Sequence, residues 1–117
     1  MKKTVSIFLS FLIICGLLSI SGCGKAESFK KSDGKISVVT TIFPYYDFVR
    51  QLAGDKADIR LLLSPGSDPH SYEPTPSDIV AIENCDIFIY NGGESDEWVD
   101  GVLSSIENKN VKVMKMM

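Results

Sequence analysis

The segment from Ser64 to Pro76 contains the chain's only histidine, His70, together with four of its five prolines. Proline restricts the backbone, so these residues predict a stiff loop that holds the imidazole in place. A neutral imidazole is the commonest protein ligand for zinc, and it also suits manganese or iron. The segment therefore makes His70 the candidate metal ligand of the chain.

One histidine does not complete a metal site, because zinc takes about four donors. Asp68 and Glu73 lie close to His70 in the sequence and carry carboxylate oxygens. In the alternative interpretation His70 is a solvated or hydrogen-bonded residue, Asp68 fixes the turn before Pro69, and Glu73 faces solvent near a helix start. The residue types alone leave both interpretations open.

Four short apolar runs predict the strands that position this loop. They are β-branched or aliphatic and mostly continuous, which is typical of parallel strands buried on both faces. The runs are residues 36–41, 57–63, 86–90 and 111–114. Helical patterns lie between them: one from Pro44 to Gly54, one after the cap Thr75, and one with Val99 and Val102 on its apolar face. This alternation predicts an α/β fold with a doubly wound parallel sheet.

The His70 loop follows the second predicted strand. In open α/β sheets, ligands bind outside the carboxyl ends of the strands. We therefore expect His70 at the binding edge of the sheet.

The amino terminus predicts export. Lys2 and Lys3 precede an uncharged apolar stretch that ends at Ile20-Ser21-Gly22-Cys23. A positive start, a short apolar run and small residues at the exit are typical of a signal peptide rather than a spanning helix. The exit resembles the bacterial lipobox, so we predict a lipoprotein signal peptide over residues 1–22 and acylation of Cys23. The alternative is an incidental cysteine beside an ordinary cleavage site.

An acylated Cys23 would anchor the protein to the extracytoplasmic side of the cell membrane, because two acyl chains hold a protein there stably. Residues 23–35 are polar and aperiodic, and we predict a flexible tether. Residues 36–117 are the predicted α/β lobe. We interpret the end of the chain at Met117, directly after an apolar strand, as a truncation.

Several other functions find little support. The chain has 15 acidic and 12 basic residues and no basic cluster, which excludes a nucleic-acid surface. An exported α/β hydrolase-like enzyme with His70 as general base would need a nucleophile, but neither a Gly-x-Ser-x-Gly elbow nor a glycine-rich phosphate loop is present. Cys85 is expected to be a buried hydrophobe rather than a metal ligand. The acidic run at residues 94–100 is expected to be a helix amino end rather than a cation site.

Residues 69–78, Pro-His-Ser-Tyr-Glu-Pro-Thr-Pro-Ser-Asp, resemble the signature of the metal-binding lipoproteins of ABC importers. This family comprises the zinc and manganese solute-binding proteins of cluster A-I. The similarity extends to residues 40–44, to residues 49–55 and to residues 84–92.

The resemblance implies a two-lobed, non-enzymatic receptor of which this chain is the amino-terminal lobe. His70 would be the first ligand of a transported divalent metal, with zinc preferred over manganese. The other ligands would come from later sequence, and the partner would be the membrane permease of an ABC importer. An adhesin-type surface lipoprotein is the alternative function.

Overall fold

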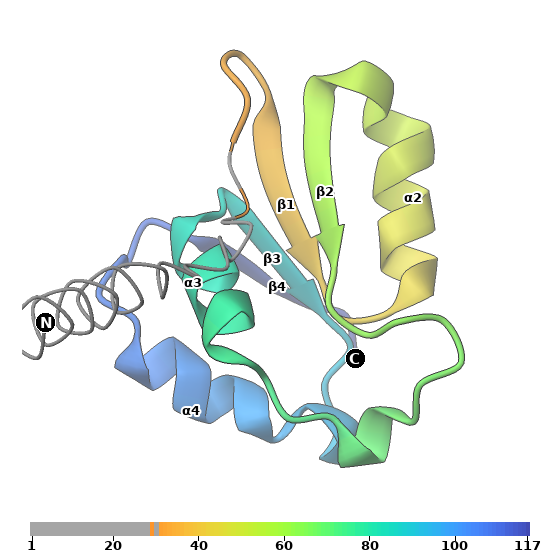
Figure 1. Cartoon of the computed structure of the whole chain (residues 1–117), viewed down its shortest axis with the longest axis vertical. Coiled ribbons are helices and arrows are strands. Elements are labelled where there is room, and N and C mark those ends of the chain that lie inside the picture. Colours follow the sequence, from red (N-terminus) through yellow and green to blue (C-terminus); the bar gives the residue numbers. More distant parts are fainter. Residues whose placement is uncertain (1–28, 30) are drawn as a thin grey trace, which may run out of the picture.

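The computed structural model describes residue 29 and residues 31–117, in which strands and helices alternate along the chain (Figure 1). The predicted signal peptide, Cys23 and most of the predicted tether lie outside the described residues. The elements are β1 (Ile36–Thr40), α2 (Phe43–Ala53), β2 (Ala57–Leu61), α3 (Pro76–Asn84), β3 (Ile87–Tyr90), α4 (Trp98–Ser105) and β4 (Lys112–Lys115).

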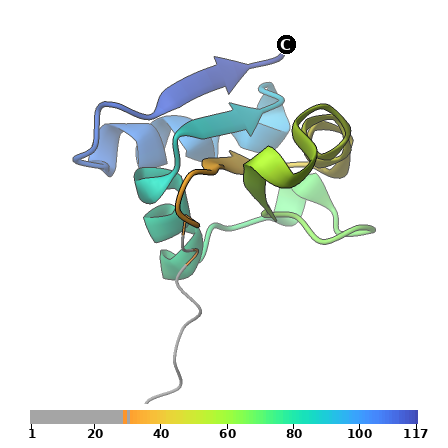
Figure 2. The same ribbon diagram turned by 90° about the horizontal axis from the view of Figure 1, so that it is seen from above.

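The four strands form one parallel sheet in the order β2-β1-β3-β4. Because the chain moves outward from β1 in both directions, the sheet is doubly wound, as the sequence predicts. In Figure 1, α2 lies on one side of the sheet, and α3 and α4 lie on the other. Figure 2 shows β4 at the outer edge of the sheet with the C-terminus beside its end.

Local sequence signals fix the ends of the helices. Pro44 occupies the first turn of α2, and Gly54 ends this helix with a φ of 51°. Thr75 and Asp78 form a reciprocal capping box at the start of α3, in which each side chain accepts from the other residue's backbone N–H. The start of α3 also fixes the end of the His70 loop.

The core lies between the sheet and the pair α3 and α4. Its buried members come from β1, β3 and both helices, and several are completely buried: Val39, Ile82, Phe88 and Val99. Cys85 belongs to this cluster, with 3% of its surface exposed. This agrees with its prediction as a buried hydrophobe.

The opposite face of the sheet is more exposed than the sequence predicts. The apolar runs predicted strands that are buried on both faces. All four residues of β4 are exposed, and no residue of α2 is buried. Leu52 of α2 is 87% exposed and Phe48 is 63% exposed. The apolar content of β4 predicted a strand correctly, but α2 covers only the β1 and β2 side of this face. Among the described residues no helix has the length and apolar character needed to cross a membrane.

Candidate metal-binding site

His70 lies in a single 3-10 turn, Pro69–Ser71, whose backbone is fixed by the preceding aspartate. The Asp68 carboxylate accepts the backbone N–H of His70 at 3.0 Å, and the Asp68 carbonyl accepts the Ser71 hydroxyl at 3.2 Å. Asp68 therefore acts as the cap of the turn, as expected from its place before Pro69. The His70 side chain itself is exposed.

Tyr72 ties this turn to the rest of the fold. Its hydroxyl donates to the Asp78 carboxylate at 3.0 Å, and its ring packs against Trp98 of α4 with the centroids 5.3 Å apart. Asp78, which is 7% exposed, also accepts from Arg60 of β2 at 2.6 Å and from the Thr75 hydroxyl at 2.7 Å. Through Tyr72 the loop is thus attached to α4 by the ring contact, and to α3 and β2 by the hydrogen bonds of Asp78.

The charge of Asp78 is stabilised by these contacts. Burial alone would raise the pKa of its carboxyl, but hydrogen bonds from Thr75, Tyr72 and Arg60 outweigh burial and lower it. Burial raises the pKa of Tyr72, followed in importance by the nearby negative charge of Asp78. The Tyr72 hydroxyl therefore remains a hydrogen-bond donor at neutral pH.

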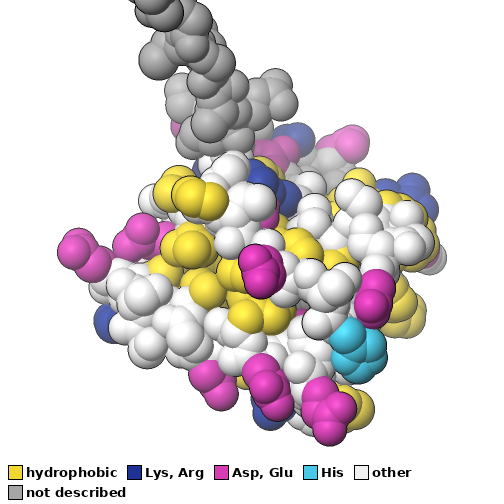
Figure 3. Space-filling view, turned by 60° about the horizontal axis from the view of Figure 1, so that its bottom comes forward, with side chains coloured by type: hydrophobic (Ala, Val, Ile, Leu, Met, Phe, Trp, Pro, Cys, Tyr) yellow, Lys and Arg dark blue, Asp and Glu magenta, His cyan; other side chains and the backbone are white. Residues whose placement is uncertain are grey.

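Two loops enclose a hollow of about 270 Å³ beside His70. One is the His70 loop after β2, and the other is the 3-10 turn Glu94–Asp96 after β3. Both lie at the carboxyl edge of the sheet, where Figure 3 shows the imidazole at the surface among acidic side chains. The lining residues are His70, Ser71, Tyr72, Glu73, Glu94, Ser95, Glu97 and Trp98.

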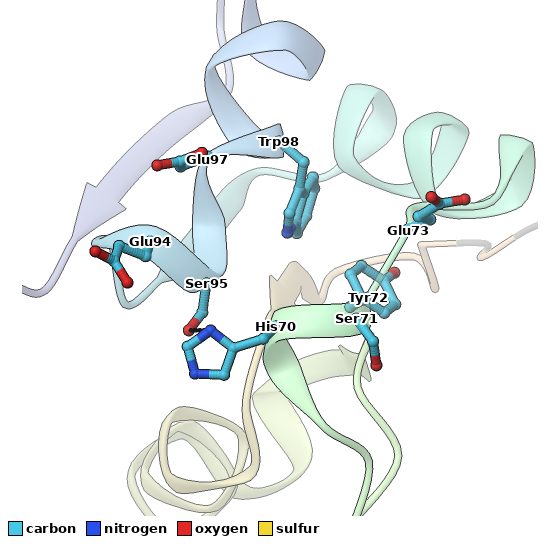
Figure 4. A pocket seen from close by; sticks show the side chains of 8 residues that line it. All are labelled: His70, Ser71, Tyr72, Glu73, Glu94, Ser95, Glu97 and Trp98. Carbon is cyan, nitrogen blue, oxygen red and sulfur yellow. Dashed lines mark hydrogen bonds between the residues drawn. The ribbon is translucent and has the colours of Figure 1, made fainter.

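Ser95 is the residue of the second loop that contacts the imidazole. Its hydroxyl lies 3.4 Å from Nδ1 of His70. In Figure 4 this nitrogen faces Ser95, and the other ring nitrogen, Nε2, points away from it. The carboxylates of Glu73 and Glu97 point away from the ring in the same view. The ring therefore offers Nε2 as the nitrogen that an incoming metal can reach.

The described residues do not bring a complete metal site together. No three His, Cys, Asp or Glu side chains gather as a possible ion-binding group in this part of the chain. The Asp68 carboxylate is used by the backbone of its own turn, and Glu73 does not face His70. Burial raises the pKa of the Cys85 thiol to about 12, so this sulfur does not offer a thiolate. Among the described residues, His70 is the one imidazole at this edge of the sheet.

Sequence reasoning identified His70 and its loop but missed Ser95 and the ion pair between Arg60 and Asp78. Ser95 lies in the acidic run, which was assigned to a helix amino end, whereas α4 begins only at Trp98. The useful signal was the pair of loops after strands two and three, which a doubly wound sheet brings to one edge.

Comparison with known proteins shows which family the chain is similar to. The family model described as zinc-uptake complex component A, periplasmic (ZnuA), matches residues 38–117. The chain belongs to this family. The match covers the whole described sheet except the first residues of β1.

Individual relatives agree with this assignment. The zinc-binding lipoprotein AdcA of Streptococcus pneumoniae is 35% identical over 113 residues, which cover 97% of this chain and 21% of AdcA. The high-affinity zinc uptake system protein ZnuA of Bacillus subtilis is 36% identical over 99 residues, covering 82% of this chain and 31% of that protein. The chain therefore spans about a fifth to a third of these relatives.

The fold agrees as well. The crystal structure of the Zn(II)-bound ZnuA-like domain of S. pneumoniae AdcA matches 70% of this chain and 31% of its own, with a TM-score of 0.63 and 39% identity. The predicted α/β fold and the resemblance to metal-receptor lipoproteins are confirmed. The relatives are named for zinc binding and uptake rather than for a reaction.

Proposed function

We propose that the chain is the amino-terminal lobe of a zinc receptor that delivers its ion to the permease of an ABC importer, and that His70 is a ligand of the transported zinc. The observation that carries the proposal is an exposed imidazole on a fixed turn at the carboxyl edge of a ZnuA-type lobe. Neutral imidazole is a preferred zinc ligand. The names of the relatives support zinc as the cargo.

The remaining zinc ligands belong to a second lobe, and the relatives are long enough to contain one. A site completed by several carboxylates would favour manganese instead, because manganese prefers oxygen ligands. We further propose that Cys23 is acylated and holds the receptor on the extracytoplasmic side of the cell membrane, which agrees with the description of AdcA as a lipoprotein.

A chimera tests the role of His70. Residues 38–117 would replace the matching segment of the ZnuA-like domain of AdcA, so that the second lobe comes from a protein known to hold zinc. Removing a hydrogen-bond partner of a zinc-binding histidine typically lowers zinc affinity about 10–100-fold, so loss of the ligand itself in His70→Ala should lower it by more than about 100-fold. Isothermal titration with zinc and with manganese measures both affinity and preference.

Glu73→Gln is the matched control, because Glu73 lies three residues from His70 and points away from the ring. It should bind zinc like the parent chimera. Circular dichroism must show that all variants are folded. Equal zinc affinity of the His70→Ala variant and the parent would show that His70 is not a ligand.

A further inference from the structure

The turn that carries Ser95 is held in one position by the side chain and the backbone of Asp96. The Asp96 carboxylate is 6% exposed and accepts the backbone N–H of Gly92 at 2.8 Å. The Asp96 backbone N–H donates a hydrogen bond to the Gly93 carbonyl at 3.1 Å. Gly92 and Gly93 have φ values of 95° and 75°, which bend the chain sharply after β3. Ser95 is therefore presented from a closed turn rather than from a loose loop.

The facing turn is equally constrained. Asp68 caps the His70 backbone, and the hydroxyl of Tyr72, two residues after His70, donates to the Asp78 carboxylate. Trp98 starts α4 three residues after Ser95 and packs on Tyr72, so the two turns share a contact behind the imidazole. The Ser95 hydroxyl thus meets Nδ1 between two fixed backbones (Figure 4).

We propose that Ser95 is a positioning residue for His70: its hydroxyl oxygen accepts the Nδ1–H proton and leaves the Nε2 lone pair free for the metal. A metal bound at Nε2 requires the ring proton on Nδ1, and that N–H then needs an acceptor. Ser95 Oγ is the acceptor that the described residues place there, at 3.4 Å. This distance is long for a hydrogen bond, so the contact biases the ring rather than locking it.

The role of Ser95 in metal binding rests on the proposed function. The effect of Ser95 on the imidazole tautomer can also be measured in the protein without metal. His70 is the only histidine of the chain, so the full 117-residue chain with ¹⁵N-labelled histidine gives a single imidazole spectrum. A purification tag without histidine keeps it so. In water a free neutral histidine prefers the proton on Nε2. At about pH 8.5, where the imidazole is neutral, His70 of the wild type should show a larger share of the Nδ1–H tautomer than free histidine does.

Three variants isolate the hydroxyl. Ser95→Ala should return the imidazole towards the free-histidine pattern, and Ser95→Thr, which keeps a hydroxyl, should retain the wild-type pattern. Ser104→Ala is the control, because this serine lies on α4 with its hydroxyl bonded to the Gly101 carbonyl. Identical tautomer ratios in the wild type and Ser95→Ala would overturn the proposal.

Zinc titration of the same variants in the chimera separates the two proposals. Ser95→Ala should lower zinc affinity about 10-fold, a typical loss for an outer partner of a ligating histidine, and Ser95→Thr should restore it. If His70→Ala lowers affinity while Ser95→Ala does not, the receptor function stands and the role of Ser95 is overturned. If His70→Ala has no effect, the ligand assignment itself fails, whatever the tautomer spectrum shows.

Discussion

His70 combines a backbone held at several points with a side chain that stays exposed. The Asp68 carboxylate accepts the backbone N–H of His70, and the Tyr72 hydroxyl donates to the Asp78 carboxylate. A ligand supported in this way loses little conformational freedom when a metal binds, because its turn is already ordered. The fixed turn holds the imidazole in contact with solvent, outside the core.

Gly92 allows the chain to bend into the second turn. Its φ of 95° strains any residue with a Cβ, and an added Cβ would lie 2.5 Å from Cε of the flexible Lys115 side chain. The lysine can move, but the backbone strain remains. Gly92→Ala should therefore lower the free energy of unfolding by about 1–2 kcal/mol, measured by urea denaturation.

Gly101→Ala is the matched control for that measurement. Gly101 lies inside α4, and its added Cβ would meet no atom within 4 Å. Alanine in a helix interior is favoured over glycine, so this variant should gain about 0.5–1 kcal/mol. Equal effects of the two substitutions would show that the turn after β3 does not depend on the positive φ of Gly92.

At the scale of elements, Asp86 joins the first residues of the two central strands. Its carboxylate accepts the backbone N–H of Ser37 at 2.8 Å and the Ser37 hydroxyl at 2.9 Å, and it pairs with Lys31 at 2.8 Å. These contacts, with Lys31 the largest and Ser37 next, lower the pKa of the Asp86 carboxyl to about 2. Asp86 thus supports the edge of the sheet opposite to the site.

Acid should weaken this support in a defined range. An unfolded aspartate has a pKa near about 3.9, so the folded state gains from the charged Asp86 above that pH and loses the gain as pH falls towards about 2. Asp86→Asn should lower the free energy of unfolding at pH 7 by about 1 kcal/mol, a discounted value because the side chain is 39% exposed. Its stability should then fall less steeply than that of the wild type between about pH 4 and 2.

Urea denaturation across that pH range provides the measurement. Asp33→Asn, in the exposed turn before β1, is the control and should follow the wild type. Parallel acid profiles for the wild type and Asp86→Asn would contradict the assigned role of Asp86.

The sequence predicted the elements well because their signals are local. Short, mostly apolar runs marked β1 to β3, and Thr75 marked the start of α3. Burial on both faces was predicted for β4 and was wrong, because burial depends on which helix lies beside a strand and not on the strand itself. The contact of His70 with Ser95 has the same origin, since it requires the strand order β2-β1-β3-β4 that no local pattern contains.

At the scale of the whole molecule, the two faces of the sheet are unequal. The side with α3 and α4 encloses the core, whereas Phe48 and Leu52 of α2 remain largely exposed on the other side. The chain also spans only 21% of AdcA and 31% of the B. subtilis ZnuA. A zinc site made jointly by two parts of such a protein would be incomplete in either part alone.

Residues 24–117 alone should therefore bind zinc weakly. Their described part offers one imidazole, and neither Asp68 nor Glu73 joins it, while Cys85 is buried. One nitrogen without a closed set of four donors predicts a Kd of about 10–1000 μM, or roughly 4–7 kcal/mol. Calorimetry on the folded monomer measures this, with His70→Ala expected to abolish even the weak signal. Nanomolar one-to-one binding would mean that residues 24–117 already contain a complete site and that the second lobe is not needed to supply ligands.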